Sequence, residues 1–280
     1  PHRVQATPAR RDAPEPRYAA WSLRAVWARA LAAQLPMALW WVGGLGIFAA
    51  WTTGIARSSE DSLKKILVDA PPQFSQVLGG HNIATDAGFL ADILFLYLPL
   101  LLVVYALVAA GAWARDLDAG SLELVLATPV PRPRAILERF GAITLLLVGA
   151  PPVIGLVVLV SGRLAGLSLD PGYVAAALLG IVPLELLTAS VVFLLAGRAA
   201  AGVGTLVVGV LVGISFVFSL LSTALNLPAW LADLSMFQQY GSPITDGPRW
   251  GSSLAMTGLA AAMLALAVVG FTRADVRRGQ

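Results

Sequence analysis

Six long stretches of this chain carry almost no charged side chains. They are Ala30–Ala56, Ile93–Ala114, Phe140–Gly162, Pro171–Gly197, Ala199–Ala232 and Trp250–Thr272, and Glu185 is the one Asp, Glu, Lys or Arg among them. An α-helix rises about 1.5 Å per residue, so roughly 20 apolar residues cross the hydrocarbon core of a bilayer. Each stretch is long enough to do so. The sequence therefore predicts an all-α polytopic membrane protein with six transmembrane helices.

Composition excludes several classes of function. The chain is 58% hydrophobic with a mean hydropathy of +0.78, far from the range of soluble domains. It contains no cysteine, which excludes disulfides, thiolate metal sites and cysteine nucleophiles. No metal-ligand spacing, catalytic triad or G-x-x-x-x-G-K-S/T phosphate loop is present. We therefore expect a protein that is not an enzyme and that takes any energy it uses from a partner or a gradient.

The basic residues indicate how the chain is oriented. Most of the 19 Lys and Arg residues lie before the first stretch, between the second and third, and at the C-terminus. Lys and Arg accumulate in cytoplasmic segments close to transmembrane helices. We therefore expect both termini in the cytoplasm. The chain has a pI of about 9.6, but because membrane topology explains where its basic residues lie, we expect no nucleic-acid partner. The Ala-, Gly- and Arg-rich composition favours a multi-pass protein of a bacterial cytoplasmic (inner) membrane.

The chain divides into a short tail, an interfacial helix and a bundle. Residues 1–17 read as a disordered basic tail, 18–35 as an amphipathic interfacial helix that ends where Pro36 turns the chain, and 273–280 as a second tail. The bundle, 36–272, has expected spans at about 36–56, 89–113, 140–161, 173–196, 201–222 and 252–272. Ser58 and Ser59 are expected to cap a short outer helix. Residues 228–240 predict another outer helix, interfacial or re-entrant.

The segment after span two has the most specific local pattern. Asp118 is a good N-cap for a short helix of about 118–128, and alternating prolines at 129, 131 and 133 make a stiff connector to span three. Such a helix, held parallel to the membrane, suits docking into a groove on a cytoplasmic partner. An ordinary basic loop is the alternative, and the pattern alone leaves both open.

The stretch RDLDAGSLELVLATPVPRPRAILERF, Arg115–Phe140, resembles the segment between spans two and three of ABC-2 type transporter permeases. The six spans and the closing FTRADVRR, Phe271–Arg278, are also similar to that family. The resemblance implies a type V exporter-like fold and a permease subunit that pairs with a second permease copy, identical or related. It also implies two separate ABC ATP-binding subunits, which would hold ATP and Mg²⁺, and no cofactor on this chain.

The same resemblance implies a role for the connector. The residues that would couple the permease to its ATPase are Asp116, Asp118, Ser121, Leu122, Glu123, Leu126, Thr128, Arg132 and Arg134. Members of the family export drugs, antibiotics, polysaccharides or lipids, or serve metal-centre or cell-envelope assembly. Because the lining is aliphatic and aromatic with little charge, we expect an amphipathic or lipophilic cargo.

Two spans carry small residues at four-residue spacing. They are Gly46, Ala50 and Gly54 in span one, and Ala201, Thr205, Gly209 and Gly213 in span five. One small residue per turn lets two helix backbones approach closely. Packing within one subunit explains the pattern equally well, whereas the resemblance favours a dimer interface.

Glu185 lies near the middle of span four, where a charge is costly. It could contact cargo or relay protons on the transport path, form a structural hydrogen bond, or take part in ATPase-coupled movement, and Pro183 could kink the helix beside it. Asp92 is expected to be an ordinary interfacial residue at the outer edge of span two. The remaining alternatives are a gradient-driven secondary carrier using Glu185, an intramembrane enzyme, which would need a second polar group beside Glu185, and a purely structural assembly subunit.

Overall fold

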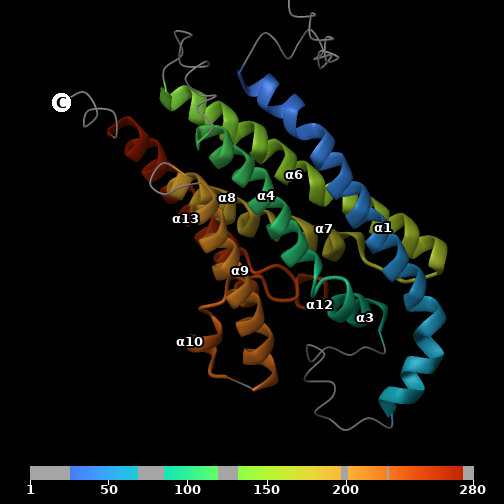
Figure 1. Cartoon of the computed structure of the whole chain (residues 1–280). Helices are drawn as coiled ribbons and strands as arrows, with labels where there is room; N and C mark the ends of the chain where they lie inside the picture. Colours follow the sequence, from blue (N-terminus) through green and yellow to red (C-terminus); the bar gives the residue numbers. More distant parts are fainter. Residues whose placement is uncertain (1–25, 69–84, 119–131, 197–200, 226, 274–280) are drawn as a thin grey trace, which may run out of the picture.

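The computed structural model describes residues 26–68, 85–118, 132–196, 201–225 and 227–273, and every regular element in these ranges is a helix. Figure 1 shows their arrangement. The elements are α1 (Val26–Val68), α3 (Asp86–Ile93), α4 (Leu98–Asp118), α6 (Arg132–Ala165), α7 (Pro171–Leu179), α8 (Val182–Ala196), α9 (Ala201–Ala224), α10 (Ala229–Ala232), α11 (Met236–Tyr240), α12 (Pro243–Asp246) and α13 (Trp250–Arg273).

The predicted all-α polytopic fold is confirmed. Six helical segments are long and apolar enough to cross a membrane: Trp27–Ala56, Asp86–Asp116, Pro133–Ala165, Pro171–Ala196, Gly202–Ser222 and Trp250–Thr272. We call them spans one to six. The start of α1 and the end of α13 lie at the same end of the bundle, which we call the basic end; the opposite end, where α10, α11 and α12 lie, is the loop end (Figure 1).

The spans form two groups. Helix α1 packs along α6, where the Thr53 hydroxyl donates a hydrogen bond of 2.6 Å to the Ser161 hydroxyl. Helix α8 packs between α4 and α13, and α9 lies against α4. In the most apolar window of spans two and four, 56% of residues are buried inside the bundle, against 17% in spans five and six. Spans two and four therefore form the centre, and the outer faces of the others are left for lipid or another protein.

Aromatic side chains fill the basic end of the bundle. The Trp113 ring of α4 stacks on Phe193 of α8 at 5.5 Å, and Phe140 of α6 meets Phe193 edge-on at 5.1 Å. The Trp113 ring also approaches Phe271 of α13 at 6.4 Å. Rings from four helices thus join the two groups of spans at this end, with interactions worth about 1 kcal/mol per pair beyond their burial.

Helix α1 differs from the expectation at both ends. It runs without interruption through Pro36, so residues 26–35 continue directly into the helix of the first span and the predicted turn at Pro36 is wrong; residues 18–25 lie outside the described ranges. It also continues to Val68, so no separate helix begins at Ser58. A proline inside a helix removes one backbone hydrogen bond, whereas ending the helix at membrane depth would leave several groups unpaired, so continuation costs less.

Spans two and four are each broken near the loop end. In span two, the Phe95 amide donates to the Leu90 carbonyl, five residues back, and the Tyr97 amide donates to the Leu94 carbonyl, three residues back. In span four, a turn at Gly180 and Ile181 separates α7 from α8. This turn lies just before Pro183, beside which we expected a kink. The break in span two likewise lies just before a proline, because Pro99 is the second residue of α4 as Pro183 is of α8.

The region between spans five and six is more divided than the sequence predicts. Instead of one helix over 228–240, two short helices, α10 and α11, are separated by a turn that ends at Ser235. A further short helix, α12, follows Gly241, whose φ of +69° favours glycine. At the start of span four, Asp170 caps α7 by accepting hydrogen bonds from the amides of Gly172 and Tyr173.

Candidate functional site

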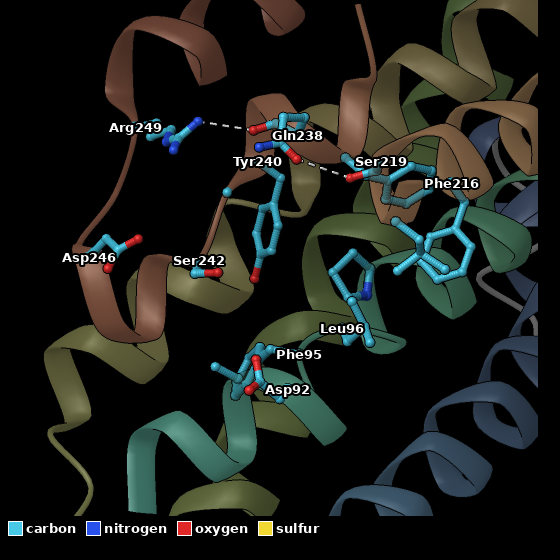
Figure 2. Close-up of a pocket in the computed structure, with 15 residues that line it drawn as sticks. Asp92, Phe95, Leu96, Phe216, Ser219, Gln238, Tyr240, Ser242, Asp246 and Arg249 are labelled. Atoms are coloured by element: carbon cyan, nitrogen blue, oxygen red, sulfur yellow. Dashed lines mark hydrogen bonds between the residues drawn. The ribbon is translucent and has the colours of Figure 1, made fainter. Parts of the chain in front are cut away.

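A cavity of about 220 Å³ opens at the loop end, between the break in span two, the end of α9 and the segment from α11 to the start of α13 (Figure 2). Its apolar wall includes Phe95, Leu96, Phe216, Leu220, Phe237 and the ring of Tyr240. Its polar lining is Asp92, Ser219, Gln238, Ser242, Asp246 and Arg249. We call this the loop-end cavity. Segments far apart in the sequence meet here, which makes it a candidate binding site.

Span two supplies one wall of the loop-end cavity. Asp92, Phe95 and Leu96 lie three and four residues apart, so they share one face of the helix and its following turn. The Asp92 side chain is 4% exposed. It therefore lies deep in the fold and is not the ordinary interfacial residue that we expected.

The opposite wall is held in place by hydrogen bonds between α9 and α11. The Ser235 hydroxyl donates to the Ser215 carbonyl at 2.8 Å, and the Met236 amide donates to the Ser215 hydroxyl at 3.1 Å. The same Ser235 hydroxyl caps α11 by accepting from the Phe237 amide at 3.2 Å. These bonds fix Phe237 against Phe216, whose rings meet edge-on at 5.3 Å.

Tyr240 lies in the middle of the site and ties it to span four (Figure 2). At the break, the Ile181 amide donates to Leu178 instead of Ala177, and the Tyr240 hydroxyl donates to the Ala177 carbonyl at 2.9 Å. Burial raises the pKa of the Tyr240 phenol, so this group stays protonated and remains a hydrogen-bond donor. The side chain therefore supports the break in span four while its ring borders the loop-end cavity.

Arg249 closes one side of the cavity. Its guanidinium lies over Gly241, where a Cβ atom would come within 2.8 Å of Arg249 Nε, and it donates to the Gln238 carbonyl at 3.0 Å. The Gln238 side-chain oxygen accepts from the Ser219 hydroxyl at 3.3 Å. Figure 2 shows Arg249 and Gln238 on one side of Tyr240 and Asp92 on the other. A second cavity of about 180 Å³ borders Tyr240, Arg249, Gly180 and Pro183, so the two spaces share a wall.

Glu185 is placed differently from Asp92. Its side chain is 0% exposed, and among the described residues neither carboxyl oxygen has a hydrogen-bond partner. The Tyr105 phenol of α4 lies within electrostatic range of it. Glu185 lines none of the cavities described above. In this conformation it is therefore enclosed between α4 and α8.

The expected ATPase-coupling residues lie only partly within the described ranges. Asp116 near the end of α4 forms an ion pair with Arg139 of α6, and the Arg139 guanidinium lies 4.9 Å from the centre of the Trp113 ring. Arg134 pairs with Glu138 at 2.7 Å. Asp118 ends α4 and Arg132 begins α6. Ser121, Leu122, Glu123, Leu126, Thr128 and the rest of the expected coupling helix lie outside the described residues.

The small residues expected at a dimer interface divide into two sets. Gly46 faces Val157 of α6, Thr205 lies against Gly111 of α4, and Gly209 faces Leu107 of α4, so these positions pack within the chain. Around Gly54 and Gly213 an added Cβ atom would meet nothing within 4 Å. Ala50 is half-buried, and Ala201 begins α9.

The chemistry of the site is that of binding. Within the described ranges, no group of three or more His, Cys, Asp or Glu side chains is placed to hold a metal ion. The loop-end cavity combines one buried carboxylate, aromatic rings and several hydrogen-bonding groups, which is the composition of a small-molecule site. Sequence reasoning missed its wall residues Phe216, Phe237 and Gln238. The predicted outer helix over 228–240 included Phe237 and Gln238 by position alone, and no feature of the sequence pointed to Phe216.

Comparison with known proteins identifies the family. The family described as "Multidrug efflux system permease Rv1217c, C-terminal domain" matches residues 23–272. No curated protein and no solved structure matches the chain. Because the match covers nearly the whole chain and all six spans, the chain belongs to this family of efflux permeases.

Proposed function

We propose that this chain is the membrane subunit of an ATP-driven, ABC-2 type exporter of amphipathic or lipophilic compounds. The observation that carries the proposal is the family match across all six spans, in a chain that contains no phosphate-binding loop of its own. In this proposal ATP is hydrolysed on a separate subunit, in two copies, and the six spans act as the permease in a bacterial cytoplasmic membrane.

At the basic end, movement of a docked ATPase could be transmitted to the spans through the connector between α4 and α6. The connector 119–131 joins α4 to α6, and the ion pair between Asp116 and Arg139 links the same two helices beside it. Helix α6 packs against α1, whereas α4 packs against α8 and α9. A movement of a docked connector would thus reach both groups of spans, and the basic end would face the cytoplasm together with both chain ends.

A second permease copy would complete the path. Helices α1 and α9 expose apolar side chains, including Trp40, Ile47, Leu206, Val210 and Ile214. Gly54 and Gly213 are the small residues still open to a neighbouring helix. The proposed dimer therefore uses the outer faces of these two helices, and cargo would leave between the copies toward the loop end.

Two other functions receive less support. A gradient-driven carrier would need Glu185 to exchange protons or ions with water, but this carboxyl is fully enclosed in the conformation described. A role in cell-envelope or metal-centre assembly fits the same permease architecture. The match to a multidrug efflux family favours export of small molecules instead.

The test is reconstitution with an ABC ATP-binding subunit encoded beside this chain. We expect a complex of two permeases and two ATPases in lipid nanodiscs, with ATP hydrolysis stimulated at least several-fold by the permease. Glu123→Arg in the connector should abolish both complex formation and stimulation. Asp233→Arg, an equal charge reversal at the exposed loop end, should leave both unchanged. Failure of the wild-type chain to bind any such ATPase would refute the ATP-driven mechanism.

A further inference from the structure

We propose that the loop-end cavity binds an organic cation, with its ammonium group beside Asp92 and its apolar body against Phe95, Phe216 and Phe237. The inference rests on the proposed function only in treating this ligand as exported cargo. The binding itself follows from the chemistry of the cavity and needs no ATPase.

The charged groups around the cavity favour a cation. Asp92 lines it and is 4% exposed, so its carboxylate acts in a medium of low dielectric constant, where a charge attracts its opposite far more strongly than in water. Asp246 adds a second negative charge at the exposed rim. Arg249 is the one cationic residue in the described lining, and it is exposed and donates to the Gln238 carbonyl. An anion would meet Asp92 at the buried side of the cavity.

The aromatic wall favours the same ligand. Phe216 contacts Phe237 edge-on at 5.3 Å and lies 6.3 Å from the Tyr97 ring, and Phe95 follows Asp92 by one turn. The faces of aromatic rings attract cations, and this attraction strengthens when water is excluded. A carboxylate that shares a cavity with several such rings favours a positively charged group with an apolar surface.

The volume limits the size of the ligand. A protein cavity of about 150 Å³ can hold benzene. The loop-end cavity, at about 220 Å³, therefore accommodates one aromatic ring and a small ammonium group. A larger cargo would insert such a portion and leave the rest near the mouth, beside Ser242 and Asp246.

The test uses one introduced thiol. Because the chain has no cysteine, Ser219→Cys places a single thiol in the cavity wall, and its alkylation by N-ethylmaleimide reports occupancy. The probes are benzyltrimethylammonium and phenylmethanesulfonate, which share the ring and methylene group and differ in the sign of the charge. Ser168→Cys, in a neighbouring cavity of about 610 Å³ that shares only Asp246 with the loop-end cavity, is the control position. Purified permease in nanodiscs is used without ATPase.

We expect benzyltrimethylammonium to slow alkylation at position 219 and not at 168, and phenylmethanesulfonate to slow neither. Adding Asp92→Asn should raise the half-protecting concentration of the cation at least about tenfold. Asp246→Asn, at the exposed rim, should change it less than about threefold. Equal protection by the two ions, or cation protection unaffected by Asp92→Asn, would overturn the proposal.

A second variant covers the case in which Asp92→Asn does not yield monodisperse protein. Phe237→Leu keeps an apolar side chain and removes one aromatic face, so it should weaken cation protection several-fold. Unchanged protection would contradict the role assigned to the aromatic wall. The alkylation assay contains no ATPase, so its result is independent of the ATP-driven mechanism. If the permease binds no ATP-binding subunit but the cation still protects position 219, the cation site stands and only the ATP-driven mechanism is refuted.

Discussion

Spans two and four invite comparison, because each is broken near the loop end and each carries a buried carboxyl group. Asp92 lies at the end of α3, just before the break in span two, and lines the loop-end cavity. Glu185 lies just after the break in span four and is enclosed by its neighbours, with Tyr105 nearby. The two residues are similarly buried, with Asp92 4% and Glu185 0% exposed, but only Asp92 borders the loop-end cavity. Burial of a carboxyl group within the bundle therefore does not by itself show whether that group borders a cavity.

Helix geometry explains part of the difference. The break in span four also borders a cavity, through Gly180 and Pro183. Glu185 follows Pro183 by two residues, about 200° around the helix, so the two lie on opposite sides of α8. In span two, Asp92 and the residues of the break share the face that meets the cavity. The same kind of interruption thus exposes one carboxylate and encloses the other.

The largest expected effect comes from placing a permanent charge in the enclosed site. Glu185→Lys should prevent folding, because a charged group without a partner in a membrane interior costs about 3 kcal/mol or more. The measurement is the yield of monodisperse protein extracted from membranes, with wild type beside it. Normal yield with retained transport would show that the region between α4 and α8 admits water, and the contrast with Asp92 would fail.

A smaller effect is expected from Asp92→Asn. This change keeps the shape of the side chain and removes its charge, so yield should stay near that of the wild type while binding of cations weakens about tenfold. The measurement is stimulation of ATP hydrolysis by benzyltrimethylammonium in the reconstituted complex. An unchanged half-stimulating concentration would mean that Asp92 is structural, as Glu185 is in this comparison.

Tyr240→Phe tests the contact that joins α11 to the broken span four. It removes the hydroxyl that donates to the Ala177 carbonyl and leaves that carbonyl without this donor at the break. We expect a loss of about 1 kcal/mol in stability, measured as a lower midpoint of thermal unfolding in detergent. Tyr173→Phe, at an exposed position of the same end, should have no comparable effect. Equal midpoints for the two variants would exclude a supporting role for Tyr240.

The sequence predicts the positions of the six spans, because these depend on the length of apolar stretches. All six spans lie where the charge-free stretches place them, since crossing a bilayer requires a long apolar helix and little else. The cap at Asp170 is equally local, because it depends on residues two and three positions away. The connector helix lies outside the described residues, so that prediction is untested.

The site depends on contacts between distant segments, whereas each break is followed by a proline. Pro99 gives the turn at Leu94–Tyr97 a local signal, but nothing local predicts that the Tyr97 ring meets Phe216 of α9, more than 100 residues later. Asp92 was visible in the sequence, but its burial comes from those same later segments. Pro36 shows the reverse case, in which a strong local signal is overridden because the backbone needs its hydrogen bonds inside a membrane.

The smallest effect is expected from Glu185→Gln, which distinguishes a structural role of this carboxyl group from a role in proton transport. Glu185→Gln keeps the volume and polarity of the side chain and removes only its ability to ionise. If Glu185 is a structural group between α4 and α8, yield and substrate-stimulated ATP hydrolysis should each change less than about twofold, since a neutral acid and an amide meet the same surroundings. A carrier that moves protons through this residue would instead lose transport while folding normally. That outcome would require Glu185 to reach water in another conformation, and span four, with its break at Gly180, would then be the element that moves.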